Sequence, residues 1–162
     1  MKKIYLGILA GSLLSTQCFA LTVKMELTDK ANTEIGTIEL AETSRGVLIT
    51  PNLNSLPPGP HGFHMHINPT CAEGGMAAGG HYDPGKTGKH AGPYGEGHLG
   101  DLPVLWVNAE GKATTPTLAP RLKLRDFKGH SLMIHGGGDN YADTPEKLGG
   151  GGARIACGVI EK

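Results

Sequence analysis

The sequence predicts an all-β protein, an antiparallel sandwich or barrel that carries two long functional loops. Short runs of alternating apolar and polar residues recur along the 162 residues with turn residues between them, and helical periodicity is nearly absent. Most of the 26 glycines lie in residues 59–100 or 136–152, together with several prolines. These two stretches are expected to be loops, because so many glycines and prolines interrupt regular strands and helices.

The chain opens with a segment that predicts a secretory signal peptide, residues 1–20. Lys2 and Lys3 form a positively charged start and residues 4–14 form a short apolar run. Small and polar residues then lead to an expected cleavage position at Ala20.

Removal of the signal peptide would leave residues 21–162 as a single exported domain. Two alternatives stay open for the N-terminal segment. One is a buried or membrane-anchored helix, although the apolar run is short for a bilayer span. The other is a lipoprotein signal acylated at Cys18, for which Gln17 is a poor fit because that position favours a small residue.

The expected strands share an alternation of apolar and polar residues. They lie at residues 21–28, 35–40, 46–50, 63–67, 102–107, 113–118, 131–135 and 154–160. In the first of them Val23 and Met25 alternate with Lys24 and Glu26, as in a half-buried strand. A turn signal at residues 108–111 separates the fifth strand from the sixth.

The charge balance excludes two classes of protein. Fifteen Lys and Arg balance fifteen Asp and Glu. A nucleic-acid-binding protein would need an excess of positive charge to neutralise phosphates, and so would a polybasic membrane-surface protein. Neither partner is expected.

The cysteines predict one disulfide bond in the exported domain. Cys18 would leave with the signal peptide, so Cys71 and Cys157 remain and only one pairing is possible. An exported domain permits such a bond. The alternative is a pair of free buried thiols.

Histidines concentrate around the first long loop in a pattern that predicts metal binding. His64 and His66 stand two apart on an expected strand, so both rings point to one face. His135 ends a later strand and could join them in a nitrogen-ligand set suited to copper. The alternative for all of these residues is a collection of surface and capping histidines.

A second ligand set follows in the same loop. His81, His90 and His98 are followed by Asp101, and three imidazoles with one carboxylate can form a tetrahedral zinc site. The ordered spacing of both sets favours metal binding over chance.

The chain resembles the copper,zinc superoxide dismutases in their bacterial exported form. Five motifs carry the resemblance, which covers essentially all of residues 21–162. They are GFHMHINPTC at 62–71, AGGHYDP at 78–84, GHLGDLP at 97–103, MIHGGGDNY at 133–141 and GGGARIACGVI at 150–160.

The resemblance implies an eight-stranded Greek-key sandwich or flattened barrel with one copper and one zinc per chain. The implied copper ligands are His64, His66, His81 and His135. The implied zinc ligands are His81, His90, His98 and Asp101, with His81 bridging the two metals. Cys71 and Cys157 would be the family's intrasubunit disulfide.

The resemblance also implies a reaction and three residue roles. Superoxide would be converted to O2 and H2O2 by alternating reduction and oxidation of copper, while zinc stays structural. His81 would pass a proton to the product, Asp139 would link His64 and His90, and Arg154 would attract and orient the anion. A non-catalytic periplasmic protein that binds or delivers copper and zinc is the alternative function.

One segment departs from the eukaryotic pattern of the family. Four glycines and Ala153 precede Arg154, without a hydroxyl residue, so the rim that guides superoxide is not transferable from eukaryotic relatives. Lys86, Lys89 and Lys147 could steer anions, although a solvated loop surface is the preferred interpretation.

Three further residues have plainer interpretations. His61 is expected to make a structural hydrogen bond, and His130 is expected to be exposed in a turn. Trp106 could be core or could anchor a subunit contact, since aromatic residues are enriched at interfaces. A homodimer is possible, because bacterial relatives include both dimers and monomers.

Overall fold

The computed structural model describes residues 20–30 and 33–162, and this part of the chain contains strands, three short 3-10 helices and no α-helix. In chain order the elements are β1 (Ala20–Leu27), β2 (Glu34–Thr43), β3 (Gly46–Leu53), β4 (Gly59–His61), β5 (Phe63–His66), η1 (Met76–Ala78), β6 (Leu105–Val107), β7 (Thr117–Ala119), η2 (Leu124–Phe127), β8 (His130–His135), η3 (Lys147–Gly150) and β9 (Arg154–Ile160). Apart from Ala20, the expected signal peptide lies outside the described residues. A helix with the length and apolarity to cross a bilayer is not found in the described part.

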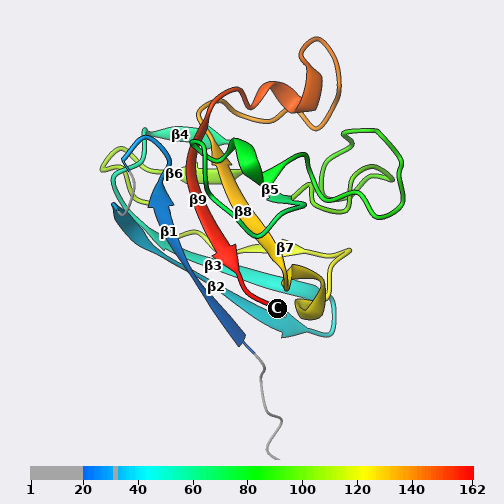
Figure 1. Cartoon of the computed structure of the whole chain (residues 1–162), viewed down its shortest axis with the longest axis horizontal. Coiled ribbons are helices and arrows are strands. Elements are labelled where there is room, and N and C mark those ends of the chain that lie inside the picture. Colours follow the sequence, from blue (N-terminus) through cyan, green and yellow to red (C-terminus); the bar gives the residue numbers. More distant parts are fainter. Residues whose placement is uncertain (1–19, 31–32) are drawn as a thin grey trace, which may run out of the picture.

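Seven strands form one antiparallel sheet in the order β5-β8-β9-β1-β2-β3-β7, and β4 pairs with β6 in a second, small sheet. The C-terminal strand β9 lies between β8 and β1, while β1, β2 and β3 follow one another as hairpins (Figure 1). The large sheet curls and, with the small one, forms a flattened Greek-key barrel. The predicted all-β class is confirmed.

The strand count differs from the eight expected. The chain is extended from residue 59 to residue 66, but it changes partners within that run, so that β4 pairs with β6 and β5 pairs with β8. The expected strand at residues 113–118 is reduced to β7. Ala113 forms only an isolated bridge to Leu53, because the chain there runs beside β3 at a single point.

The core lies inside the barrel and follows the predicted alternation. Val23 and Met25 on β1 are buried while Lys24 is exposed. Phe63 and Phe127 are completely buried in the same cluster. Each large apolar side chain buried in this way stabilises the fold by about 1.5–3 kcal/mol. The barrel is therefore a rigid support for its loops.

Strand β5 is buried on both faces, which simple alternation does not predict. Phe63 and Met65 join the core, and His64 and His66 are also fully buried. The outer face is covered because the chain after β5 and the chain after β8 fold back over it. Short backbone bonds join these segments, among them Gly62 N–H to Gly137 O at 2.8 Å and Met65 N–H to Gly100 O at 2.8 Å.

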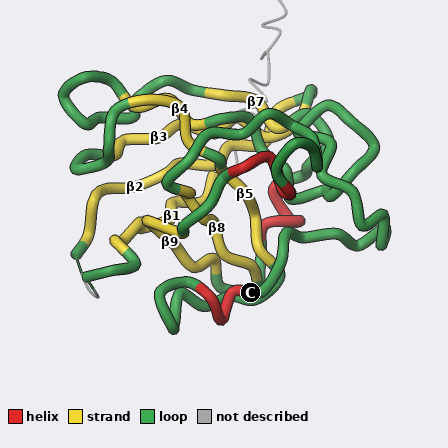
Figure 2. The backbone as a smooth tube through the Cα atoms, turned by 90° about the horizontal axis from the view of Figure 1, so that it is seen from above, coloured by secondary structure: helices red, strands yellow, loops and turns green. Residues whose placement is uncertain are grey.

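Two long loops, residues 67–104 and 136–153, form this cover. In Figure 1 the first extends beside β5, and the second, which contains η3, rises above the start of β9. Figure 2 shows that they consist of irregular backbone with short helical turns. As expected from the glycine and proline distribution, the loops contain no long helix or strand.

Candidate metal centre

Seven buried side chains predicted as ligands converge between the barrel and the two loops. Strand β5 supplies two of them, the first loop supplies four and the end of β8 supplies one. They are His64, His66, His81, His90, His98, Asp101 and His135. The alternative of scattered surface and capping histidines is therefore wrong.

Two groups within this set bring their ligand atoms within 4.8 Å of one another. The first is His64, His66, His81 and His135, and the second is His64, His81, His90 and Asp101. The second group has His64 where the resemblance implies His98. His98 nevertheless lies at the same carboxylate, with its Nδ1 atom 3.4 Å from Asp101 Oδ1. His64 and His81 belong to both groups.

The ring nitrogens provide a test of whether metals fit here. Five buried nitrogens have no hydrogen-bond partner: His64 Nδ1, His66 Nε2, His90 Nδ1, His98 Nδ1 and His135 Nε2. Buried polar atoms in folded proteins are nearly always paired, so an array of unpaired nitrogens requires an explanation. Lone pairs aimed at metal ions supply one.

In four of these five rings the opposite nitrogen is anchored. His66 Nδ1 lies 2.9 Å from Gly79 O, and His135 Nδ1 lies 3.2 Å from Gly152 O. A carbonyl accepts only from an N–H, so each of these rings carries its proton on Nδ1 and presents a bare Nε2. This pattern of one anchored and one free nitrogen is typical of metal-binding histidines.

Asp139 joins the two groups from behind. Its Oδ2 lies 2.8 Å from His64 Nε2, and its Oδ1 lies 2.7 Å from His90 Nε2. Gly149 covers this carboxylate, and a Cβ there would lie 1.9 Å from Asp139 Oδ1. Position 149 also has a φ of +73°. Only glycine combines this conformation with such a close approach.

The carboxylate of Asp101 contacts three histidine rings. His81 Nδ1 lies 2.9 Å from Oδ1 and His90 Nδ1 lies 3.0 Å from Oδ2, in addition to the His98 contact. The His90 contact is close but makes no hydrogen bond. Three Nδ1 atoms around one carboxylate form a compact set of four donors, as a tetrahedral zinc site requires.

Burial sets the protonation of the first group. It lowers the pKa of His64 to about 3, of His66 to about 2 and of His135 to about 4. Burial also lowers the pKa of His81. Because charged rings would be poorly solvated here, these histidines are neutral at pH 7 and keep a lone pair for a metal.

At the second group, the carboxylates of Asp101 and Asp139 favour the charged form of His90. Burial opposes a charge on His90, but contacts with Asp101 and Asp139 outweigh it and raise the pKa of His90 to about 9. Burial would raise the pKa of both carboxyls, yet their histidine partners hold the pKa of Asp101 and of Asp139 far below the usual range. Without metal, His90 is therefore protonated at pH 7 between two ionised carboxylates, and it must give up that proton before its Nδ1 atom can bind a cation.

An opening of about 330 Å³ leads from solvent to the first group. Its lining includes His81, His135 and Arg154, with Lys147 and Leu148 at its side. A second opening, lined by Gly88, His98, Asp143, Lys147 and Leu148, leads to the second group. The two groups are reached by different routes.

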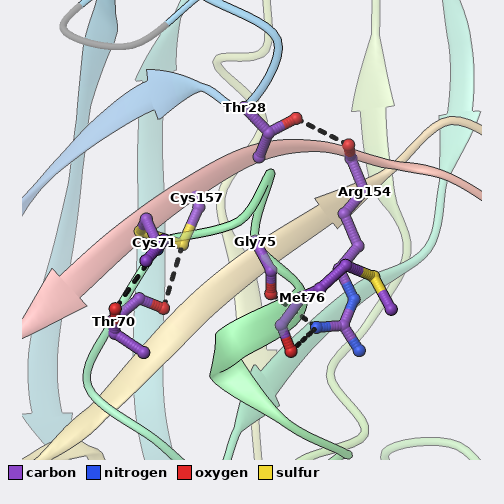
Figure 3. The surroundings of a disulfide bond; sticks show 8 residues. Thr28, Thr70, Cys71, Gly75, Met76, Arg154 and Cys157 are labelled. Carbon is purple, nitrogen blue, oxygen red and sulfur yellow. Dashed lines mark hydrogen bonds between the residues drawn. A yellow bond between two sulfur atoms is a disulfide. The ribbon is translucent and has the colours of Figure 1, made fainter.

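Arg154 is held in place by the first loop. Its guanidinium donates to Gly75 O at 2.6 Å (Figure 3). It also donates to Gly79 O at 2.6 Å. Cys71 and Cys157 form the predicted disulfide, with Cα atoms 5.8 Å apart, and so fasten the same loop to β9. The free-thiol alternative is wrong.

The family described as copper/zinc superoxide dismutase matches residues 34–160. The chain belongs to this family. It is 58% identical to superoxide dismutase 1 of Salmonella typhimurium, a copper–zinc enzyme by name, over an alignment of 177 positions that covers all of both chains.

Solved structures of the copper/zinc superoxide dismutase family agree with the fold. The Brucella abortus enzyme is 51% identical, with a TM-score of 0.84 over 88% of this chain and all of that one. The solution structure of the monomeric Salmonella enterica enzyme is 52% identical, with a TM-score of 0.77 and the same coverage.

Several residues outside the two groups also have predicted roles. His61 is buried, with Nδ1 2.7 Å from His135 O and Nε2 2.7 Å from Pro57 O, so the predicted structural hydrogen bond is confirmed. The prediction that His130 is exposed is wrong. Its ring packs against Tyr82 and its Nδ1 lies 2.7 Å from Ile67 O, because the loop after β5 runs past this position.

The tryptophan and the lysines lie at the surface. Trp106 on β6 is 60% exposed, so the core alternative is wrong. Lys86, Lys89 and Lys147 are all exposed. Of the three, Lys147 lines the opening with Arg154.

Sequence reasoning missed residues that hold the loops around the centre. Asp143 accepts the backbone N–H of His90 at 2.9 Å, and the Tyr141 hydroxyl accepts the N–H of Val104 at 2.9 Å. Arg121 bonds to four carbonyls of the first loop. None of them has a spacing signal, because their partners are backbone atoms whose positions depend on the loop path.

Proposed function

We propose that this chain is a superoxide dismutase, which converts superoxide and protons to O2 and H2O2. The observation that carries the proposal is the pair of adjoining histidine groups that share His81 and leave five other ring nitrogens unbonded. Membership of the copper/zinc superoxide dismutase family over most of the chain supports the same activity.

We assign copper to His64, His66, His81 and His135, and zinc to His81, His90, His98 and Asp101. The unpartnered nitrogens and the close approach of the rings to Asp101 support this division. When bound, copper supplies alternating one-electron oxidation and reduction of superoxide, and zinc supplies a fixed positive charge without redox chemistry. Asp139 orients His64 and His90 from behind.

His81 is assigned to bridge the two metals. Its Nδ1 lies 2.9 Å from Asp101 on the zinc side, and its ring forms part of the opening's wall. Positive charge near both nitrogens favours loss of the ring protons. Because the ring borders the opening, we assign Nε2 as the atom that takes up a proton from solvent and gives it to the reduced anion.

Arg154 is assigned to receive the substrate. Its guanidinium is fixed by two short bonds to carbonyls and lies in the lining of the opening with His81 and His135. A fixed cation at the mouth of a cleft attracts a small anion and can raise association rates by roughly 10–10³-fold. Lys147 adds positive charge at the same opening.

The processing of the chain is proposed from its sequence. Residues 1–20 act as a signal peptide and residues 21–162 form a single domain in the periplasm. The Cys71–Cys157 disulfide supports an oxidising compartment. Relatives include a protein described as monomeric, and a homodimer built on exposed Trp106 is the second possibility.

The direct test is the decay of superoxide in the presence of the mature protein, loaded with one copper and one zinc per chain. We expect a rate constant near the diffusional ceiling of roughly 10⁸–10⁹ M⁻¹ s⁻¹, which superoxide dismutases are already known to approach. The His135→Ala variant should lose this activity. The His130→Ala variant removes a histidine from the same strand outside the centre and should retain it.

Two results would contradict the proposal. If the loaded protein leaves superoxide decay at the buffer rate, it is a copper and zinc binding or delivery protein. If His135→Ala remains fully active, the copper assignment is wrong.

A further inference from the structure

Arg121, two residues after β7, directs its guanidinium into the first loop. Its Nε atom donates to Pro93 O at 3.1 Å, and one terminal nitrogen donates to Gly97 O at 3.1 Å. The other terminal nitrogen donates to Gly92 O at 3.4 Å and, at a shorter distance, to His98 O. Four carbonyls from seven consecutive residues thus converge on one cation.

The charge of Arg121 has no acidic partner among the described residues; its bonds there go to these carbonyls. Four converging carbonyl oxygens repel one another, since each carries partial negative charge. The planar guanidinium offsets this repulsion, because its fork of donors satisfies several acceptors at once. Without it, the same backbone path would leave four oxygens clustered together.

The segment around this cation is a closed ring, which we call the zinc-side loop (residues 89–98). The N–H of His98 donates to Lys89 O at 2.9 Å and so closes the ring. A Cβ at Gly97 would lie 2.4 Å from Lys89 O, and one at Gly95 would lie 2.4 Å from Ala91 O. The backbone is therefore wound as tightly as glycine permits.

The ring carries a proposed zinc ligand at each end. His90 Nδ1 and His98 Nδ1 lie 3.0 and 3.4 Å from the two oxygens of Asp101. Their separation depends on the path of the residues between them. That path is the one that Arg121 holds at Gly92, Pro93 and Gly97, and at His98 itself.

We propose that Arg121 is a positioning residue for zinc, which fixes the spacing of His90 and His98 through the backbone of the zinc-side loop. The inference rests on the zinc assignment made above. Arg121 bonds to carbonyls and not to ligand atoms, so it sets the geometry of the site before zinc binds. Among the described residues, none of its hydrogen bonds goes to a side chain assigned to copper alone, so its effect falls mainly on zinc.

Other contacts keep the loop attached when Arg121 is replaced. Asp143 holds the N–H of His90 at 2.9 Å, and Tyr141 packs against Gly92, where a Cβ would lie 2.6 Å from the ring. An Arg121 variant should therefore fold with a looser zinc-side loop. Loss of groups that orient metal ligands typically lowers metal affinity about 10–100-fold.

The experiment measures zinc and copper affinities by competition with chelators, using the full-length mature protein. Arg121→Ala should lower zinc affinity about 10–100-fold and lower copper affinity much less. Arg121→Lys should fall between, because a lysine offers three donors from one point. Cobalt placed in the zinc site should give an altered visible spectrum in Arg121→Ala, since ligand geometry sets that spectrum.

Chemical rescue separates positioning from general stability. Millimolar guanidinium should refill the carbonyl cluster of Arg121→Ala and restore zinc affinity, whereas sodium chloride at equal ionic strength should not. Arg125→Ala is the matched control, since the Arg125 side chain is 85% exposed and lies on neighbouring η2. It should leave zinc affinity unchanged.

His98→Ala distinguishes failure of this inference from failure of the zinc assignment. If His98→Ala loses zinc and Arg121→Ala does not, Arg121 has no positioning role. If His98→Ala also keeps zinc, the zinc assignment itself is wrong. If Arg121→Ala weakens both metals equally and guanidinium restores neither, the residue only stabilises the fold and the inference is overturned.

Discussion

Arg154 is a single side chain whose position at the centre is fixed by backbone carbonyls. Both ends of its guanidinium are bonded to loop carbonyls, and it faces the opening that reaches His81 and His135. The motif that contains it could be read from the sequence. The carbonyls that hold it could not, because they come from a loop almost eighty residues earlier in the chain.

Arg154→Ala should slow superoxide decay about tenfold or more, since the anion loses a cation worth roughly 10–10³ in association rate. Arg154→Lys should retain part of the rate. The dependence of the rate on ionic strength should weaken in Arg154→Ala and persist in Arg154→Lys, because salt screens an attraction that only the alanine variant has lost. An unchanged salt dependence in Arg154→Ala would assign the attraction to other residues.

The amino-acid composition of the two loops predicts only some of the contacts that hold them in place. The density of glycine and proline predicts long loops, and the cysteine pair predicts their link to the last strand. The closeness of Gly149 to Asp139 is not predictable, because it depends on how the second loop folds back on itself. The strand expected at residues 113–118 is shorter in the structure for a related reason. An alternating pattern forms a strand only where a neighbouring strand pairs with it, and most of this segment has no such neighbour.

The disulfide should contribute strongly to stability, because it closes a separation of 86 residues. A double Cys71→Ser, Cys157→Ser variant should lose about 4 kcal/mol of unfolding free energy by the chain-entropy estimate. Urea unfolding of the metal-free proteins measures this loss. A loss well below 1 kcal/mol would mean that the loop stays ordered without the bond.

For the molecule as a whole, burying this many titratable groups makes metal-free stability depend on pH. Unfolded histidines titrate near pH 6.5. Folded His64, His66 and His135 stay neutral down to about 3, 2 and 4, so below pH 6.5 the unfolded chain binds more protons. Stability therefore falls as pH falls.

At alkaline pH, stability falls because the folded chain binds more protons than the unfolded chain. Folded His90 keeps its proton to about pH 9, whereas the unfolded chain has lost it, so stability falls as pH rises from 6.5 to 9. We expect a maximum slightly above pH 6.5, because there the three histidines with lowered pKa still outweigh His90, and the slope is steeper on the acid side because more groups act there. Urea titrations of metal-free protein across this range measure the curve. A flat curve would show that these histidines are not buried as described.

The two openings meet at one short turn, since Lys147 and Leu148 border both. Each proposed metal site thus has its own opening to solvent. The width of both openings nevertheless depends on the same two residues of η3, Lys147 and Leu148. A change that displaced this turn should therefore widen both openings together. Chelators would then reach the proposed zinc site, and larger anions would reach the proposed copper site.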